Sequence, residues 1–582
     1  KLTLTSTGAG IDLATLKRYK DHEAKNVYTF QTPPSSDPRV RPLAIDQVKV
    51  TTGGATSIVD TAGLHWNLQS STDRTATFTL DLSPAGAPVV RVRRTYELFD
   101  SSHPGRGYDL NVTQSFENLT DQPIKVGTTI TGPAIPPQEL ERGPDRQVVV
   151  GYLDGKQVKV IQALVEEFKD ATPRDFLTHK DGQPLLWAGG ASVYFNAILR
   201  PEPLDPSSVV PKQLTRVEAR ALNPEADPPL RQLTMQFVTD ERDIAPKGTL
   251  ALPMTLYLGP KLRSLLNEPF YAAFPRSFNG TLVITNPWCG ICTFQWLIDA
   301  LVRMLAFFHL ILRDWGLAII LLVCIVRICL HPITKRSQMS MLKMGKMGPE
   351  IERLKKKHGD DKDEMNKAMM QVYKEQGFTP ILGCLPMFLQ MPIWIALYAA
   401  LNSTFELRQE PFLWGWTWIH DLARPDRLIS WPPIKLFWGI EIGALNILPI
   451  FLAVVFYLQQ KYTPKPPATT PEQQQQQKMM QWMSLLFPVF LYNGPSGLNL
   501  YILTSTTIGI IESKRIRDHI KQREEEEKAG KVIVDAKPTR QSKKKDGKEK
   551  DEPKKKGGLG GWLADLQAKA EEIRREADKK RG

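Results

Sequence analysis

The sequence predicts a multidomain protein: an all-β sandwich domain, then a five-span α-helical membrane domain that carries a helical hairpin, then a basic tail. Two observations predict this division. Short alternating or β-branched runs, separated by turn residues, occupy about the first 260 residues, and five long apolar runs occur only after residue 295. The mean hydropathy of −0.27 therefore averages a polar part and an apolar part of the chain.

The amino-terminal part has the pattern of many short strands with Pro and Gly between them, which is typical of a large antiparallel sandwich. We place this domain at residues 1–265. The predicted strands are 47–52, 75–82, 89–98, 108–116, 148–153, 157–161, 214–221, 233–238 and 249–258. We find no phosphate-binding glycine loop, no metal-ligand spacing and no nucleophile motif here, so we expect no cofactor, no metal and no catalytic residue.

Five apolar runs predict the membrane domain, residues 313–515. They are 315–330, 378–401, 446–459, 479–492 and 498–511. Some are shorter than the roughly 20 residues that cross a hydrocarbon core. Five such runs in succession, with the charges concentrated between them, fit membrane spans better than the buried helices of one soluble core.

The charges between the runs orient the predicted spans. The connection 331–377 holds 11 Lys and Arg against 7 Asp and Glu, and 514–582 holds 23 against 15, whereas 402–445 holds 4 against 5. Because Lys and Arg accumulate in cytoplasmic loops, we expect the first connection and the tail in the cytoplasm and residues 1–312 outside. Export of that domain requires a signal anchor, which we expect upstream of Lys1.

Three segments outside the spans have their own patterns. The apolar residues of 294–312 recur at helical spacing, which predicts an amphipathic helix in the outer interface or an extension of the next span. The polar stretch 332–377 predicts a cytoplasmic hairpin of two helices, 337–358 and 362–376, broken at Gly359. Residues 516–582 predict a basic, mostly disordered tail.

Two cysteines form a Cys-Gly-Ile-Cys motif, at Cys289 and Cys292, that resembles a thioredoxin active site. That chemistry requires a strand before the motif and a helix after it within a βαβ unit. Because no such unit is predicted, a local disulfide or two unreactive thiols fit better.

Several motifs occur in order across roughly residues 311–515, and together they resemble the YidC/Oxa/Alb family of membrane protein insertases. They are Ile325-Val-Arg327 with His331-Pro-Ile-Thr-Lys335, Gly359-Asp-Asp-Lys362, Gly383-Cys-Leu-Pro-Met-Phe-Leu-Gln-Met-Pro-Ile-Trp-Ile-Ala-Leu-Tyr398, Phe405-Glu-Leu-Arg-Gln-Glu-Pro-Phe412, Trp418-Ile-His-Asp-Leu422, and Pro495-Ser-Gly-Leu498 with Tyr501. The β domain resembles the large periplasmic supersandwich of Gram-negative members in size, position and β content alone. This resemblance implies a bacterial inner membrane and places residues 1–312 in the periplasm.

The resemblance implies a non-enzymatic insertase and chaperone for nascent inner-membrane proteins, acting alone or with the Sec translocon and without a small-molecule substrate. Its spans would enclose a hydrophilic groove, open to the cytoplasm and the lipid, that contains Arg327. A guanidinium inside a bilayer is costly, which favours a wet and functional site; the alternative is that Arg327 extends to the inner interface. The other groove residues implied are Leu385, Met387, Met391, Pro392, Ser484, Leu486, Pro488, Phe490 and Tyr501.

Three positions depart from the family pattern. Val323 stands where a Thr is common, Ile502 where a second aromatic residue is common, and Ser484 where a Pro is common. These departures imply that the contacts of the groove are arranged differently here. The short apolar runs fit a locally thinned bilayer, which the family is thought to exploit.

The basic tail predicts a partner of its own. Its lysines should attract the phosphate-rich RNA of ribosomes, although they also satisfy the positive-inside rule. The lysines concerned are Lys543, Lys544, Lys545, Lys554, Lys555 and Lys556. Two other readings of the whole chain stay open: a membrane transporter with a soluble cap, and a membrane-anchored carbohydrate-processing enzyme that uses the sandwich domain.

Overall fold

The computed structural model describes residues 1–30, 37–84, 86–99, 102, 107–139, 145–176, 183–283, 295–346, 353, 380–435, 441–462 and 471–528. It describes only the backbone at residues 229, 295, 340–346, 380–390, 394, 433, 435, 441, 471–473, 480, 484, 523–524 and 527–528. Residues 1–520 form one compact unit. Within this unit, a sheet-rich amino-terminal domain is followed by a helical region, as the sequence predicts.

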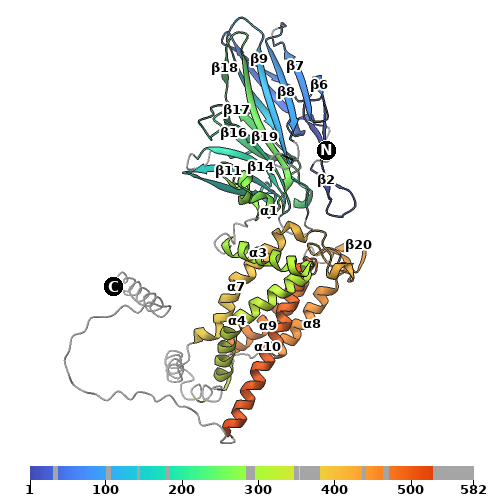
Figure 1. The fold of residues 1–582 in the computed structure, drawn as a ribbon, viewed down its shortest axis with the longest axis vertical. Helices are drawn as coiled ribbons and strands as arrows, with labels where there is room; N and C mark the ends of the chain where they lie inside the picture. The colour runs from blue at the N-terminus through green and yellow to red at the C-terminus, as the bar shows by residue number, and fades with distance from the viewer. Residues whose placement is uncertain are drawn as a thin grey trace, which may run out of the picture. The chain divides into compact units, whose positions relative to one another are not determined.

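Two antiparallel sheets build the amino-terminal domain (Figure 1). The nine-stranded sheet has the order β12 (Gln157–Leu164), β11 (Gln147–Asp154), β14 (Leu185–Ala191), β15 (Phe195–Pro201), β19 (Thr249–Pro260), β9 (Asp109–Asn118), β8 (Val90–Leu98), β7 (Thr75–Leu82) and β6 (Asn67–Ser71). The seven-stranded sheet has the order β13 (Arg174–Asp175), β16 (Leu214–Ala221), β17 (Leu233–Thr239), β10 (Ile124–Thr131), β4 (Ile45–Thr52) and β5 (Ala55–Asp60), with β18 (Arg242–Ile244) paired to β10. A smaller sheet joins β1 (Leu2–Leu4), β2 (Ile11–Lys20) and β3 (Val27–Thr29).

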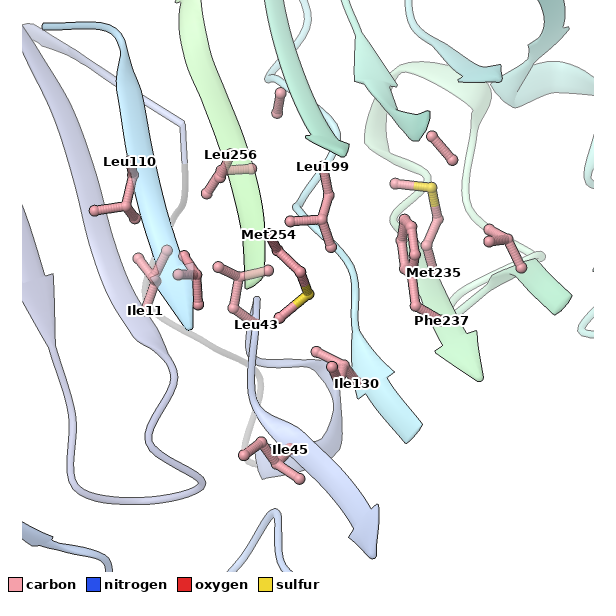
Figure 2. Close-up of a cluster of buried hydrophobic side chains, with 14 of the residues drawn as sticks. Ile11, Leu43, Ile45, Leu110, Ile130, Leu199, Met235, Phe237, Met254 and Leu256 are labelled. Atoms are coloured by element: carbon pink, nitrogen blue, oxygen red, sulfur yellow. The ribbon is translucent and has the colours of Figure 1, made fainter. Parts of the chain in front are cut away.

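Side chains from both large sheets meet in one hydrophobic core. Figure 2 shows Leu110, Leu199 and Leu256 of the nine-stranded sheet near Ile130 and Phe237 of the seven-stranded sheet. All five side chains are at most 2% exposed. Alternating inward and outward residues, as along β8 and β9, give each strand one face for this core.

All nine predicted strands lie on observed strands, which confirms the sandwich pattern. The nine correspond to β4, β7, β8, β9, β11, β12, β16, β17 and β19, so the other strands of this domain were not predicted. Two of these, β14 and β15, are buried at every residue, so their sequences do not alternate. Short helices then follow β19: α1 (Arg263–Leu266), α2 (Pro269–Ala272) and η4 (Phe278–Thr281). Tyr271 and Phe278 pack beside Trp187 and Tyr257, so the packed segment continues beyond residue 265.

The helical region contains six long helices among the described residues (Figure 1). They are α3 (Gln295–Leu312), α4 (Trp315–Lys346), α7 (Pro380–Ser403), α8 (Ile447–Tyr462), α9 (Pro471–Phe490) and α10 (Ser496–Lys528). α3 packs against α4 and α7, and α8 packs against α9. Within the described part of the chain, one helix is long and apolar enough to cross a membrane, at Trp315–Met339, with shorter apolar helices at Met391–Ser403 and Ile447–Tyr462.

α4 runs without a break across Pro332, where the sequence predicts the start of the hairpin. A proline removes one backbone donor, here the one that would bond the carbonyl of Ile328, four residues earlier. The helix continues through this position despite that loss. Apart from residue 353, the rest of the hairpin lies outside the described residues, as do Cys289 and Cys292.

The connection between α7 and α8 contains a strand pair that the sequence analysis did not predict, β20 (Ile429–Lys435) and β21 (Glu441–Leu445). Asp426 lies just before it and caps α8: its carboxylate accepts from the backbone N–H groups of Ile447 and Leu448 at 2.7 and 3.0 Å. A carboxylate at a helix N-terminus satisfies donors that the helix leaves free.

Candidate functional site

Arg327 lies on α4, and its guanidinium contacts α10. Its Nη2 and Nε donate to the hydroxyl of Ser505 at 2.9 and 3.2 Å. The guanidinium also lies against Gly509, one turn further along α10: a Cβ at that glycine would be 3.3 Å from Nη1. Among the described residues no carboxylate pairs with Arg327: its hydrogen-bond acceptor is the hydroxyl of Ser505, and its guanidinium packs against Gly509.

Two further polar contacts join the same helices. Nδ1 of His331 lies 2.6 Å from Oε1 of Glu512, whose side chain is 8% exposed. The amide of Gln338 donates to the hydroxyl of Ser513 at 2.9 Å. We call these contacts the α4–α10 seam, which consists of Arg327, His331 and Gln338 on α4 and Ser505, Gly509, Glu512 and Ser513 on α10.

Helix periodicity explains why the seam forms. Arg327 and His331 are four residues apart, so they lie on one face of α4. Ser505, Gly509 and Glu512 follow the spacing i, i+4, i+7, which places them on one face of α10. Arg327 was predicted as a site residue from the sequence, whereas its α10 partners Ser505 and Gly509 were not. Their spacing within an otherwise apolar run is the signal that could have revealed them.

Tyr501 is the other predicted groove residue on α10. It is 4% exposed and lies four residues before Ser505, on the same face of the helix. The structure therefore brings the helix that carries Tyr501 against Arg327.

The remaining predicted groove residues lie on α7 and α9. On α7, Met391 is 52% exposed and Pro392 is half-buried. On α9, Leu486 and Phe490 are exposed and Pro488 is buried. Leu385, Met387 and Ser484 are described by their backbone only, within α7 and α9. No hydrogen bond joins the described side chains of these two sets to Arg327. The six predicted tail lysines lie outside the described residues.

Large apolar side chains are exposed along three helices. They are Trp296, Phe307, Leu310 and Ile311 on α3, Ile450, Phe451, Val454 and Tyr457 on α8, and Met479, Trp482, Met483, Leu486, Val489 and Phe490 on α9. Soluble proteins rarely expose contiguous apolar surface of this kind, whereas a bilayer would cover it.

The β domain has a hollow of about 440 Å³ over β4, β10 and β17, lined by both polar and apolar residues. Its two carboxylates are Asp240 and Glu241. Glu241 pairs with Lys49 at 2.5 Å, and the hydrogen bond from Lys49 lowers the pKa of Glu241. A general acid needs a raised pKa, so Glu241 is poorly suited to that role. Among the described residues no group of His, Cys, Asp or Glu could hold a metal ion.

Two family models match consecutive parts of the chain. The model described as the YidC periplasmic domain matches residues 1–282, and the model described as the 60Kd inner membrane protein matches residues 307–524. The second match contains α4, α7, α8, α9 and most of α10, and thus both sides of the α4–α10 seam.

Curated relatives carry the name membrane protein insertase YidC. The chain is 28% identical to that of Anaeromyxobacter sp. (strain Fw109-5), over 73% of this chain and 66% of the relative. It is 33% identical to that of Syntrophobacter fumaroxidans over 49% of this chain and 47% of the relative, and 37% identical to that of Shewanella sp. (strain MR-7) over 47% and 44%. The matched part of the chain thus spans less than two thirds of each of these relatives.

Among solved structures, one similar chain is an active YidC insertase crystal structure, at 17% identity and a TM-score of 0.29, covering 86% of this chain and 82% of that one. A galactose mutarotase related enzyme from Lactobacillus acidophilus covers 44% of this chain and 94% of its own, at 14% identity and a TM-score of 0.29. Scores this low do not establish a shared fold. The two consecutive family models and the named relatives do establish the family: this chain belongs to the YidC membrane protein insertases.

Proposed function

We propose that the chain inserts the apolar segments of nascent proteins into the bacterial inner membrane and helps them fold. The observation that carries this proposal is the position of Arg327 in the α4–α10 seam, without a carboxylate partner among the described residues. A permanent cation is rare in a membrane-spanning helix, and it normally faces a polar or water-filled space. Arg327 would therefore attract the polar flank of a substrate into a groove beside the seam.

The guanidinium of Arg327 has N–H donors that the hydrogen bonds to Ser505 do not use. It carries five N–H donors, and the two hydrogen bonds to Ser505 use two of them. The others can bind water or the carboxylate of a substrate flank, and Arg binds carboxylates strongly. Substrate release requires no covalent step, because burial of the apolar segment in lipid favours insertion.

The exposed apolar surface supports a route for the apolar segment. Met391 on α7 and Leu486 and Phe490 on α9 present flexible or aromatic side chains outward. Methionine adapts to many apolar partners, as an insertase with varied substrates requires. We propose that the substrate's apolar segment slides along α7 and α9 while its flank occupies the groove, which the ten predicted groove residues would line.

The topology that we propose has five spans, with residues 1–312 in the periplasm and the tail in the cytoplasm. The span at Trp315–Met339 and the Lys and Arg count of 331–377 support this orientation. α3 would lie at the outer interface. Its inner face, with Ile298 and Leu305, packs in the core, while Trp296 and Leu310 on other faces are exposed.

We propose ribosomes as partners through the tail lysines, and the Sec translocon as a further partner. We propose no enzymatic activity. Carbohydrate processing would need a cleft with paired carboxylates or a His–Glu pair. In the hollow over β4, β10 and β17, Glu241 is ion-paired with Lys49 and no histidine among the described residues lines the space, so this hollow does not support that alternative.

Crosslinking of stalled nascent chains tests the proposal. A photoreactive residue at Met391 or Leu486 should crosslink to the apolar segment of a ribosome-bound membrane protein. Ile58, which is 63% exposed on β5, is the matched control and should give no product. Equal crosslinking from all three positions, or none from α7 and α9, would contradict an insertase with this substrate route.

A further inference from the structure

The α4–α10 seam contains a carboxylate that the proposed mechanism does not use. Glu512 lies on the same face of α10 as Ser505 and Gly509, the two residues that contact the guanidinium of Arg327. Its side chain is 8% exposed and lies 2.6 Å from His331. A buried carboxylate thus lies within about one helical turn of the α10 position that contacts Arg327.

The position of this carboxylate is fixed by the seam. His331 follows Arg327 by one turn of α4, and Glu512 follows Gly509 by one turn of α10. Ser513, the next residue, binds Gln338 of α4. The contact with His331 therefore holds the carboxylate of Glu512 on the side of α10 that faces α4, near Arg327.

We infer that Glu512 is a specificity-determining residue: it sets how strongly the groove prefers acidic over neutral or basic substrate flanks. This inference rests on the proposed function. Arg327 attracts acidic flanks, and Glu512 repels them from the same side of the groove. The two residues carry opposite charges on facing helices of one seam, so the balance between them determines the preference.

His331 acts as the positioning residue for Glu512. Its ring nitrogen meets the carboxylate at hydrogen-bond distance, and a carboxylate that accepts a hydrogen bond keeps its orientation. The side-chain amide of Asn is a neutral N–H donor that reaches about as far from the backbone as Nδ1 of His331 does. His331→Asn should therefore preserve the flank preference, whereas His331→Ala should weaken it by freeing Glu512.

Three substrates that differ only in their translocated flank test the inference, with two Asp, two Asn or two Lys in that flank. Insertion is measured in proteoliposomes, per folded insertase, and expressed as the ratio of acidic to neutral substrate. Glu512→Gln should raise this ratio about twofold to fivefold and lower insertion of the Lys substrate, because a repulsive charge is gone. Glu512→Asp should keep the wild-type ratio.

Three controls separate charge from structure. Ser513→Ala breaks the neighbouring α4–α10 contact without a change of charge, so it should leave the ratio unchanged. The double variant Arg327→Ala with Glu512→Gln should lose the raised ratio, because the attracting charge is absent. Glu512→Ser is a second neutral variant for use if the amide does not pack.

The outcomes are distinguishable. If Glu512→Gln lowers insertion of all three substrates alike, or leaves the ratio unchanged, Glu512 only fastens the two helices and the inference is overturned. If the wild-type protein inserts none of the substrates, the proposed function itself fails.

Discussion

The guanidinium of Arg408 forms a buried ion pair with Glu139. Nε of Arg408 donates to Oε2 of Glu139 at 2.9 Å, and the two side chains are 5% and 2% exposed. Nη2 of the same arginine donates to the carbonyl of Lys20 at 2.6 Å, and the guanidinium lies over the ring of Phe195. One side chain from the connection after α7 therefore binds three parts of the β domain.

Replacing Arg408 should destabilise the protein. Above about pH 7, where Glu139 is ionised, Arg408→Ala leaves it buried without its cation, and loss of one partner of a buried pair costs about 3–5 kcal/mol. Arg408→Lys keeps the charge but loses the second hydrogen bond, so it should lose less. Thermal unfolding in detergent measures both. An unchanged midpoint for Arg408→Ala would show that the pair does not contribute to stability.

The same pair predicts a pH dependence. Burial raises the pKa of Glu139 to about 7, although Arg408 opposes the shift. Because the folded protein keeps a proton that the unfolded chain loses at lower pH, stability should fall as pH rises from about 4.5 to about 7. Glu139→Gln cannot titrate and should reduce this fall. Unfolding midpoints measured across that range test the prediction, and equal slopes for both proteins would contradict it.

Substitutions of Arg327 should separate charge from packing. Arg327→Ala should fold and should impair substrates with acidic flanks, because the attracting charge is gone. Arg327→Lys should retain much activity, and Arg327→Glu should be worse than Ala through like-charge repulsion. Neutral-flank substrates should change least. Equal insertion of acidic flanks by all three variants would mean that Arg327 only extends to the interface.

The absence of a bulky side chain at Gly509 should be needed for the guanidinium of Arg327 to keep its position against α10. A Cβ at this position would be 3.3 Å from Nη1, which the flexible guanidinium can accommodate, but a branched side chain would displace it. Gly509→Ala should therefore resemble the wild type, whereas Gly509→Val should approach Arg327→Ala with acidic flanks. Insertion of a neutral-flank substrate is the control. A uniform loss with Gly509→Val would indicate misfolding of the helix pair instead.

The tail should bind ribosomes by electrostatic attraction. Nine Lys lie between residues 537 and 556, and attraction of a basic segment to RNA weakens as salt releases counterions. Deletion of 529–582 leaves α10 intact and should reduce co-sedimentation with ribosomes at low salt. The difference from the full chain should shrink as salt rises. Equal co-sedimentation of the truncated and the full chain at low salt would show that the tail does not contribute to ribosome binding.

The sequence alone determined the division of this protein into an amino-terminal β domain and a helical region. Strand alternation, as in β8 and β9, is a local signal, because every second residue of such a strand is buried in the core. Arg327 stood out for the same local reason: a charge inside an apolar run is rare. Strands buried on both faces, such as β14, lack this signal and were missed.

Only the tertiary structure decided which distant residues meet. Arg327 and Ser505 are 178 residues apart, and Arg408 and Glu139 are 269 apart. No local pattern specifies such pairs, because the packing of whole helices and sheets brings them together. The contact of Arg327 with Ser505, the contact of His331 with Glu512 and the binding of Arg408 to the β domain are consequences of that packing.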